Sequence, residues 1–430
     1  MKRFKIVAIL AACEMVLSLG GCGIANAPYP HSGAASARGA QARAFESTQS
    51  LFQNITVPNH VITWDWYVRI GEVNPNAVAP YVDYAAVQAP DVNAFDAAGI
   101  KTVLYTSPNR TYVGQPMYTK DESTFAHDCS GKRILVMGKS PKVFQMDPRS
   151  PDLEPLWAAW VNRVLGNGYN YSYIFQDSAN SVHNDSAVPC GYTETTWSAA
   201  SNANDIALGK RIIYNGLGTL GDGWNKPPPA ILINPTTDGG MLEGCYGNSG
   251  QNNPLPKRTV WENFETTELK MSTIGKRFVC RGLSRPPAES AIAQRIYMYA
   301  SFLLTYSVST SIMSEKFRTP SHMSVFPEAT FVALNPLKQS PTRVAELRTS
   351  QWTYGRQYGA CYLWGKPIGA CAAVINADAP SFSHPFPWPG VYKHTLVLQG
   401  SGILDGGTAR VTGPAPPASV PGTSALIAIQ

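Results

Sequence analysis

The sequence predicts an α/β fold, a (β/α)8 TIM barrel followed by a C-terminal antiparallel β accessory domain. Short apolar runs alternate with longer segments of helical pattern, and such alternation is typical of a parallel sheet. The count of eight runs favours a closed barrel over an open sheet. The runs occupy residues 60–67, 101–105, 143–146, 171–175, 211–214, 240–242, 277–279 and 310–313.

Helical pattern is clearest between these runs, at residues 153–165, 194–208, 261–272 and 288–305. Residues 296–313 are eighteen in number and carry no charge, which meets the length of a membrane-spanning helix. Ser, Thr and Tyr recur throughout this stretch and lower its hydropathy. We therefore expect a buried helix that runs into a core strand.

The N-terminus has the pattern of a secretory signal. Three cations in the first five residues precede an apolar stretch that ends in Leu19-Gly20-Gly21-Cys22. This ending resembles a bacterial lipobox, and the resemblance implies that Cys22 becomes the lipid-modified first residue of the mature chain. Because Glu14 interrupts the apolar stretch, an ordinary cleaved signal with a stray cysteine remains the alternative. The expectation is an exported lipoprotein anchored to the bacterial membrane, periplasmic or at the cell surface, and otherwise a secreted protein.

Composition changes along the chain divide it into four segments. Residues 1–22 are expected to be the signal peptide with its lipobox, and residues 23–54, rich in Ala, Ser, Gly and Pro, a flexible tether. The catalytic barrel is expected at 55–345. The β domain is expected at 346–430, because strand-like pieces separated by Gly, Pro and Asn dominate there.

Charge and motif content exclude several classes of protein. Only 15% of residues are charged, against about a quarter in average proteins. The net charge of +6 includes no basic run after the first five residues, so we expect no nucleic-acid partner. Zinc-peptidase, serine-esterase and P-loop motifs are absent from the sequence. The glycines of Gly216-x-Gly218-x-x-Gly221 match a dinucleotide fingerprint, but prolines at 227–229 replace the helix that it requires. We expect neither a metal nor another cofactor.

Cysteine usage agrees with export. Apart from Cys13 and Cys22 the chain has six cysteines, which allow fifteen pairings that sequence alone does not distinguish. The expected disulfides join neighbouring loops or strands of the predicted fold. They are Cys129 with Cys190, Cys245 with Cys280, and Cys361 with Cys371.

Acidic residues stand directly after predicted strands. In a (β/α)8 barrel these positions line the face that carries the active site. Asp177 follows the fourth run, and Glu243 follows the sixth between glycines that let a ligand approach the backbone. Hydrolysis of a glycosidic bond needs two such carboxyl groups, one to protonate the leaving oxygen and one to attack the sugar or activate water. For either acid alone, a helix cap or an ion-pair partner is the alternative.

Other side chains at this rim are expected to bind the sugar. Aromatic rings stack on the apolar faces of sugars, while acids and amides hydrogen-bond their hydroxyls. Core packing is the alternative for the aromatic residues. The candidates are Trp64, Asp65, Trp66, Tyr105, Asp147, Asn215, Tyr246 and Glu315.

The segments YIFQDSAN, RIIYNG and GGMLEGCYG resemble those of glycosyl hydrolase barrels related to α-galactosidases and endo-α-1,4-polygalactosaminidases. The resemblance covers about residues 55–320 and implies that Asp177 is the nucleophile and Glu243 the acid/base. Gln176 departs from the apolar or acidic residue expected before the aspartate. The function expected is cleavage of an α-linked poly- or oligosaccharide by a retaining glycoside hydrolase. The alternative is a non-catalytic glycan-binding envelope lipoprotein on the same scaffold.

Overall fold

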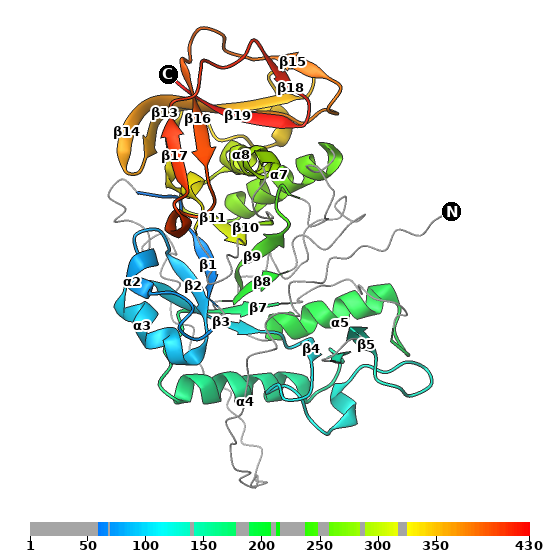
Figure 1. Cartoon of the computed structure of the whole chain (residues 1–430). Coiled ribbons are helices and arrows are strands. Elements are labelled where there is room, and N and C mark those ends of the chain that lie inside the picture. The colour runs from blue at the N-terminus through cyan, green and yellow to red at the C-terminus, as the bar shows by residue number, and fades with distance from the viewer. Residues whose placement is uncertain are drawn as a thin grey trace.

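The fold is mixed α/β, and the described residues form one parallel sheet, one large antiparallel sheet and two small antiparallel sheets (Figure 1). The computed structural model describes residues 59–67, 69–137, 142–177, 189–207, 212–215, 237–247, 258–283, 289–316 and 325–430. The predicted signal peptide, the tether and Cys22 lie outside the described residues.

Eight parallel strands form the main sheet, and their order in the sheet is their order in the chain. Thr63, just before the first strand, forms a parallel bridge with Met313 of the last, and the Met313 amide donates to Ile62 O at 2.8 Å. The first and last strands therefore also lie side by side. The strands are β1 (Trp64–Tyr67), β2 (Tyr84–Val87), β3 (Lys101–Thr106), β7 (Tyr173–Gln176), β8 (Ile212–Asn215), β9 (Thr237–Glu243), β10 (Arg277–Leu283) and β11 (Ser311–Lys316).

The sequence prediction of the third strand is wrong. The run at 143–146 forms β6 (Val143–Gln145), which pairs antiparallel with β4 (Arg110–Thr111) and β5 (Leu135–Met137) in a separate small sheet. The unpredicted β2 lies in the main sheet instead. Its alanines, at 85 and 86, are poor strand formers in isolation but are fully buried between β1 and β3. One missed and one surplus strand cancel, so β7 is still fourth and β9 sixth.

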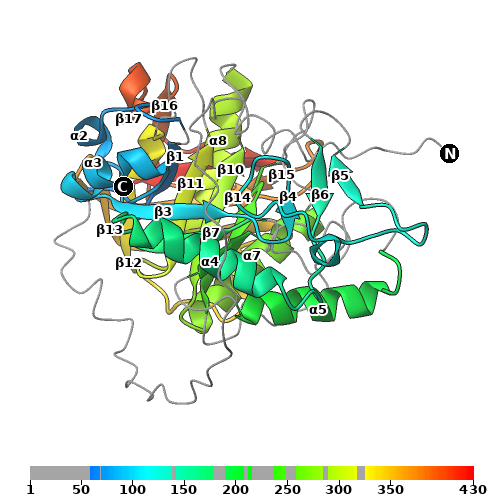
Figure 2. The same ribbon diagram turned by 90° about the horizontal axis from the view of Figure 1, so that it is seen from below.

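The four predicted helices are confirmed, as α4 (Leu153–Gly166), α5 (Glu194–Ala207), α7 (Arg258–Thr273) and α8 (Glu289–Thr305). The buried residues of α4 are Leu153, Trp157 and Val161, four apart, which gives one apolar stripe. Figures 1 and 2 show α4 lying along β3 and β7. The short helices α2 (Pro75–Val78) and α3 (Val92–Ala97) were not predicted. Short 3-10 turns occur at Ala89–Asp91, Glu122–Thr124, Pro327–Thr330, Val344–Leu347 and Ile403–Asp405.

Helix α8 runs into β11, as residues 296–313 predicted. Among the helices that the structure describes, none has the length and apolar character needed to cross a membrane.

The C-terminal region forms a six-stranded antiparallel sheet, and a two-stranded ribbon of β15 (Ser383–Pro385) and β18 (Ser419–Pro421) lies beside it (Figure 1). The first strand, β12, was expected inside the barrel segment ending at 345. Its pairing with β13 places it in the C-terminal sheet, because an apolar run does not reveal its partner strand. In sheet order the strands are β12 (Phe331–Pro336), β13 (Thr353–Leu363), β14 (Lys366–Asn376), β19 (Ser424–Ile429), β16 (His394–Gln399) and β17 (Thr408–Val411).

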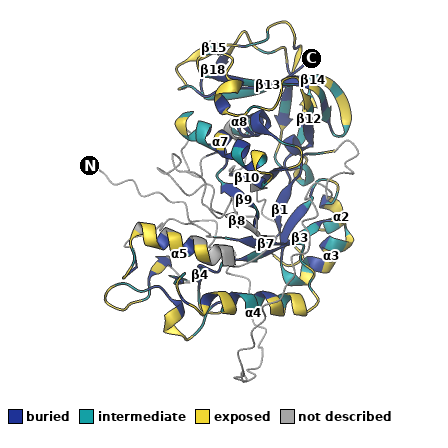
Figure 3. Cartoon of the chain, turned by 180° about the vertical axis from the view of Figure 1, so that it is seen from behind, coloured by how far each residue is buried: buried dark blue, intermediate teal, exposed yellow. Residues whose placement is uncertain are grey.

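Helix α8 packs on β14 and β19 of the C-terminal sheet while its own strand, β11, belongs to the main sheet. One apolar core consequently extends from Val61 to Ile429. A buried ion pair reinforces this contact, since Arg295 Nε donates to Glu328 Oε1 at 2.7 Å and Arg295 Nη1 to Gly400 O at 2.8 Å. Figure 3 shows mostly buried strands in the main sheet, partly exposed strands in the C-terminal sheet and exposure on the outer faces of helices.

All three expected disulfides are confirmed: Cys129–Cys190, Cys245–Cys280 and Cys361–Cys371. The second joins the turn after β9 to β10, and the third joins β13 to β14. Three disulfides indicate an oxidising compartment outside the cytoplasm.

Candidate active site

Asp177 lies at the carboxyl end of β7 and is held there by β3. Its amide donates to Thr106 O at 2.8 Å, which continues the strand pairing by one residue. Its carboxylate accepts a hydrogen bond from the Tyr105 hydroxyl, with 2.5 Å between Oη and Oδ2. Both side chains are partly exposed. Asp177 is thus oriented by a neighbouring strand and open to solvent on one side.

Glu243 is the last residue of β9. Gly239, in the same strand, lies so close to β10 that a Cβ there would stand 2.2 Å from Arg277 O. Glu243 faces Arg281 in the register of β9 and β10, and Arg281 Nη1 lies 3.1 Å from Glu243 Oε1. The Arg281 side chain is 8% exposed and that of Glu243 28%. A mostly buried guanidinium therefore orients a carboxylate that remains accessible.

Tyr105 interacts with both acids. Burial raises the pKa of its phenol well above the usual value, and the negative charges of Asp177 and Glu243 raise it further. The positive charge of Arg281 acts in the opposite direction. One hydroxyl on β3 is thus within electrostatic reach of both carboxylates and of the guanidinium.

Trp66 packs against both Arg281 and Tyr105. Its ring lies 4.5 Å from the guanidinium carbon of Arg281, a cation–π contact. It packs edge to face on Tyr105 at 6.2 Å, and its Nε1 donates to Ser314 Oγ at 3.3 Å. Trp66 therefore holds Arg281 and Tyr105 in position, and through them the two carboxylates.

The expectation that three of the aromatic candidates stack on sugars is not met. Trp64 and Trp66 are each 1% exposed, and Tyr246 is fully buried. Trp64 stacks on Trp66 at 5.7 Å. Trp64 and Trp66 both pack edge to face on Phe175, and Tyr246 packs on Phe264 of α7. Of the aromatic candidates, Tyr105 is the one that reaches the surface.

Asp65 faces away from the tryptophans on either side of it, since successive residues of a strand alternate. It is 3% exposed and accepts hydrogen bonds from the Trp66 amide at 2.9 Å and the Tyr67 hydroxyl at 3.2 Å. Burial raises the pKa of this carboxyl to about 7, against those two hydrogen bonds. Asp65 is therefore a buried structural acid, and the prediction that it contacts substrate at the rim is not supported.

Asp147 follows β6, so its expected position at the end of a main-sheet strand is wrong. Its carboxylate accepts from the Arg149 amide at 2.8 Å and from the Tyr192 hydroxyl. It closes a turn and ties it to the segment after Cys190. Asn215 ends β8 and Glu315 lies near the end of β11, but their side chains are outside what the structure describes.

The sequence prediction missed the pairing of Arg281 with Glu243. Two residues that stand equally far from the ends of neighbouring parallel strands are candidates for such a pair. Only the register between the strands shows whether they face each other. The sequence prediction also missed two buried acids of α7, Glu265 and Glu268. Their spacing from Trp261 and Phe264 places them on the apolar face of the helix. Within the described parts of the chain, no group of three or more His, Cys, Asp or Glu is arranged to hold a metal ion.

Comparison with solved structures finds matches at low identity and with TM-scores below 0.5. The glycoside hydrolase domain of PelA from Pseudomonas aeruginosa is 13% identical, with 61% of this chain and 98% of that chain covered and a TM-score of 0.39. The α-galactosidase TtGalA from Thermus thermophilus is 12% identical over 72% and 66%, with a TM-score of 0.43. The galactosidase domain of the α-galactosidase-sucrose kinase AgaSK is 8% identical over 86% and 54%, with a TM-score of 0.45.

No curated protein sequence matches the chain significantly. Among protein families, hypothetical glycosyl hydrolase family 15 (GHL15) matches residues 101–361, more than half of the 430-residue chain. The match spans the strands that carry Tyr105, Asp177, Glu243 and Arg281. The resemblance to glycosyl hydrolases that the sequence motifs predict is confirmed. The chain belongs to the hypothetical glycosyl hydrolase family 15 and is a glycoside hydrolase.

Proposed function

We propose that this enzyme cleaves an α-linked poly- or oligosaccharide with retention of configuration, using Asp177 as nucleophile and Glu243 as acid/base. The observation that carries the proposal is the position of Tyr105 relative to both carboxylates. Its hydroxyl donates to Asp177, and the charge of Glu243 raises its pKa. A retaining glycosidase needs two carboxyl groups about 5 Å apart on opposite sides of the scissile bond. Acids at the ends of the fourth and sixth strands of one sheet suit this requirement.

In the first step, the Asp177 carboxylate attacks the anomeric carbon. The bond to the glycosidic oxygen breaks as Glu243 transfers its proton to that oxygen, which leaves a glycosyl ester on Asp177. In the second step, Glu243 takes a proton from water, the water oxygen bonds to the anomeric carbon, and the ester bond breaks. Tyr105 orients Asp177 through its hydrogen bond, and the contact of Arg281 Nη1 with Glu243 Oε1 orients Glu243.

The scaffold proposed for this site is a closed (β/α)8 barrel. The bridge between Thr63 and Met313, which brings β1 next to β11, supports closure. We assign the barrel to residues that end with β11 and an accessory β domain to those from β12 onward, since β12 pairs with β13. Nothing in the accessory sheet resembles the paired acids of the rim.

We further propose that the enzyme is exported and anchored through a lipid on Cys22. The Leu-Gly-Gly-Cys sequence and the three disulfides support this placement. Cys22→Ala should move the protein from the membrane fraction to the soluble fraction. Equal membrane association of the variant and the parent would contradict the anchor.

The catalytic assignment is tested with a panel of α-linked glycans and an assay for new reducing ends. Asp177→Asn and Glu243→Gln should each lower kcat at least about a thousandfold while the thermal midpoint stays close to that of the parent. Asp147→Asn serves as the matched control, because this acid closes a turn away from the main sheet and should leave activity intact. Parental rates in both site variants would refute the proposal. Glycan binding without cleavage by the parent would favour a binding protein.

A further inference from the structure

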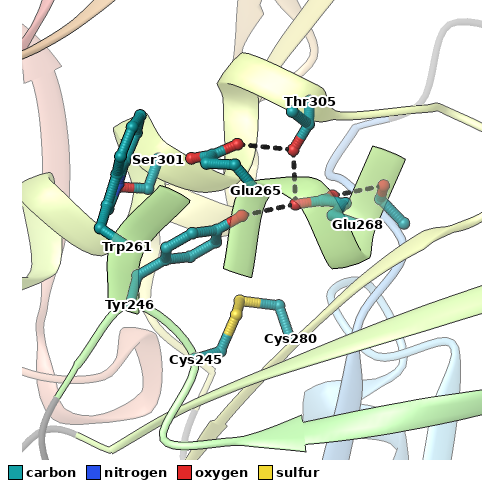
Figure 4. The surroundings of a disulfide bond; sticks show 9 residues. Cys245, Tyr246, Trp261, Glu265, Glu268, Cys280, Ser301 and Thr305 are labelled. Atoms are coloured by element: carbon teal, nitrogen blue, oxygen red, sulfur yellow. Dashed lines mark hydrogen bonds between the residues drawn. A yellow bond between two sulfur atoms is a disulfide. The ribbon is translucent and has the colours of Figure 1, made fainter. Parts of the chain in front are cut away.

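A pair of buried acids lies beside the turn that follows Glu243 (Figure 4). Glu265 and Glu268 are on α7, and both are 0% exposed. Glu268 Oε2 accepts hydrogen bonds from the Tyr246 hydroxyl at 3.0 Å and from Thr305 Oγ1 at 2.9 Å. Its other oxygen accepts from Ser311 Oγ at 2.6 Å. Glu265 Oε2 lies 2.8 Å from the same Thr305 Oγ1.

The Thr305 hydroxyl has one hydrogen but contacts an oxygen of each acid. It can donate to one of them, so the other contact requires a proton on the second carboxyl. Glu268 is the acid suited to carry the charge, since Tyr246 and Ser311 also donate to it. Glu265 Oε1 is buried and meets no donor among the described residues, which costs less for a neutral carboxylic acid than for a carboxylate. The arrangement is thus a chain in which Glu265 donates to Thr305 and Thr305 donates to Glu268.

The electrostatics agree with one proton held by the pair. Burial, followed by the charge of Glu268, raises the pKa of Glu265 well above its usual value. Burial also raises the pKa of Glu268 to about 7, although the hydrogen bonds from Ser311, Thr305 and Tyr246 lower it.

The ionisable groups that face the pair come from three other elements. Arg356 of β13 lowers the pKa of both acids through its charge, but its Nη1 donates to Leu304 O and Tyr306 O, each at 3.1 Å. The tyrosines of this region, at 297 on α8, at 306 before β11 and at 358 on β13, have pKa values raised first by burial. They stay neutral, so the titrating groups here are the two glutamates.

Tyr246 links this pair to the rim. It stands three residues after Glu243, with a φ of 51° that is unusual for a bulky residue and must be held by its surroundings. Cys245 is joined to Cys280, and the amides of Gly244 and Cys245 donate to Arg281 O at 3.0 and 3.1 Å. The turn is therefore held by β10 on one side and by the acid pair on the other.

We propose that Glu265, Glu268 and Tyr246 are positioning residues for Glu243, and that the single proton held by the acid pair keeps the turn in place. Loss of that proton would put two negative charges in contact with one hydroxyl. Repulsion between the two carboxylates would then move Glu268 away from Tyr246, and the turn would lose this hold. The inference rests on the proposed role of Glu243 in catalysis. The hold on the turn, however, can be measured without reference to activity.

Glu265→Gln and Glu268→Gln are matched tests, because both sites are on one helix and equally buried. Glu265→Gln stays neutral and can still donate to Thr305. Glu268→Gln offers one acceptor oxygen where three hydroxyls donate. We expect Glu268→Gln to lower kcat about tenfold or more with KM within about twofold, and Glu265→Gln to keep most of the parental kcat at neutral pH.

Hydrogen exchange in residues 244–247 provides the second readout. Protection of these amides should fall in the parent as pH rises above neutral, stay constant in Glu265→Gln and be low at every pH in Glu268→Gln. If Glu268→Gln does not fold, Tyr246→Phe replaces it, since it removes one hydroxyl and keeps the ring that packs on Phe264. Equal effects of Glu265→Gln and Glu268→Gln, or a parental loss of protection that persists in Glu265→Gln, would overturn the inference. An active Glu243→Gln variant would instead refute the catalytic assignment and leave the exchange result to stand by itself.

Discussion

Glu243 and Arg281 face each other on neighbouring strands, and 3.1 Å separates Glu243 Oε1 from Arg281 Nη1. The guanidinium also lies on the face of Trp66, so one buried cation connects the accessible carboxylate of Glu243 to this buried ring. Several expected results depend on this connection and on the groups next to it.

Replacement of Arg281 by Met should lower kcat/KM at least about tenfold, because the carboxylate of Glu243 loses the partner that orients it. Arg281→Lys keeps the charge but not the planar stack on Trp66, so its kcat/KM should lie between those of the parent and of Arg281→Met. Steady-state kinetics on the best glycan measures the effect. Arg163→Met, at an exposed position of α4, is the control. Full activity in Arg281→Met would show that the ion pair has no part in positioning Glu243.

Tyr105→Phe should lower kcat about tenfold, since it removes the hydroxyl that donates to Asp177 and keeps the ring on Trp66. The matched control is Tyr112→Phe, whose hydroxyl contacts Gln115 away from the rim. Both variants should unfold within a few degrees of the parent. A loss of activity of equal size in the control would point to a general effect of lost phenols.

The stereochemistry of the first product distinguishes the two glycosidase mechanisms. NMR of a reaction stopped early should show the α-anomer, because a double displacement at Asp177 restores the original configuration. Asp177→Gly should be inactive and should regain turnover with sodium azide, which occupies the space of the lost carboxylate. A β-anomer as the first product would require an inverting mechanism with Asp177 as base.

The free energy of unfolding should fall as pH rises from about 4 to about 7. Burial raises the pKa of Asp65 and of Glu268 to about 7, above their usual values near 4. In this range the folded protein holds protons that the unfolded chain has lost, so each group costs about 1.4 kcal/mol per pH unit. Asp65→Asn should flatten the slope, measured by urea unfolding at several pH values. A parallel curve for this variant would contradict the raised pKa.

Removal of the Cys245–Cys280 disulfide should affect both stability and activity, because it lies beside both partners of the ion pair. The Cys361–Cys371 disulfide in the C-terminal sheet provides a comparison. Loss of these bonds, which enclose 35 and 10 residues, should cost about 4 and about 3 kcal/mol respectively from chain entropy. Double serine variants, assayed below their thermal midpoints, should show reduced kcat only for the first pair. Equal kcat values would separate this disulfide from the site.

The alternation of apolar runs and helical segments was enough to predict most main-sheet strands and all four long helices. The disulfides expected between neighbours in that fold are the three observed. The alternation failed at β2 and at β6. Two of the four residues of β2 are alanines, which weaken its strand pattern, and burial between two neighbours supplies the stabilisation that these alanines lack. The VFQ segment of β6 has a strand pattern, but nothing in that pattern tells which sheet it joins.

The sequence by itself determined that Asp177 and Glu243 follow strands, because a strand end is a local property of the chain. Only the tertiary structure decided that Arg281 pairs with Glu243, that Tyr105 connects the two acids, and that Trp64, Trp66 and Asp65 are buried. Register between strands and depth below the surface depend on contacts between residues far apart in sequence. For the same reason, the buried pair of Glu265 and Glu268 became visible only when α7, α8 and the turn after β9 were brought together.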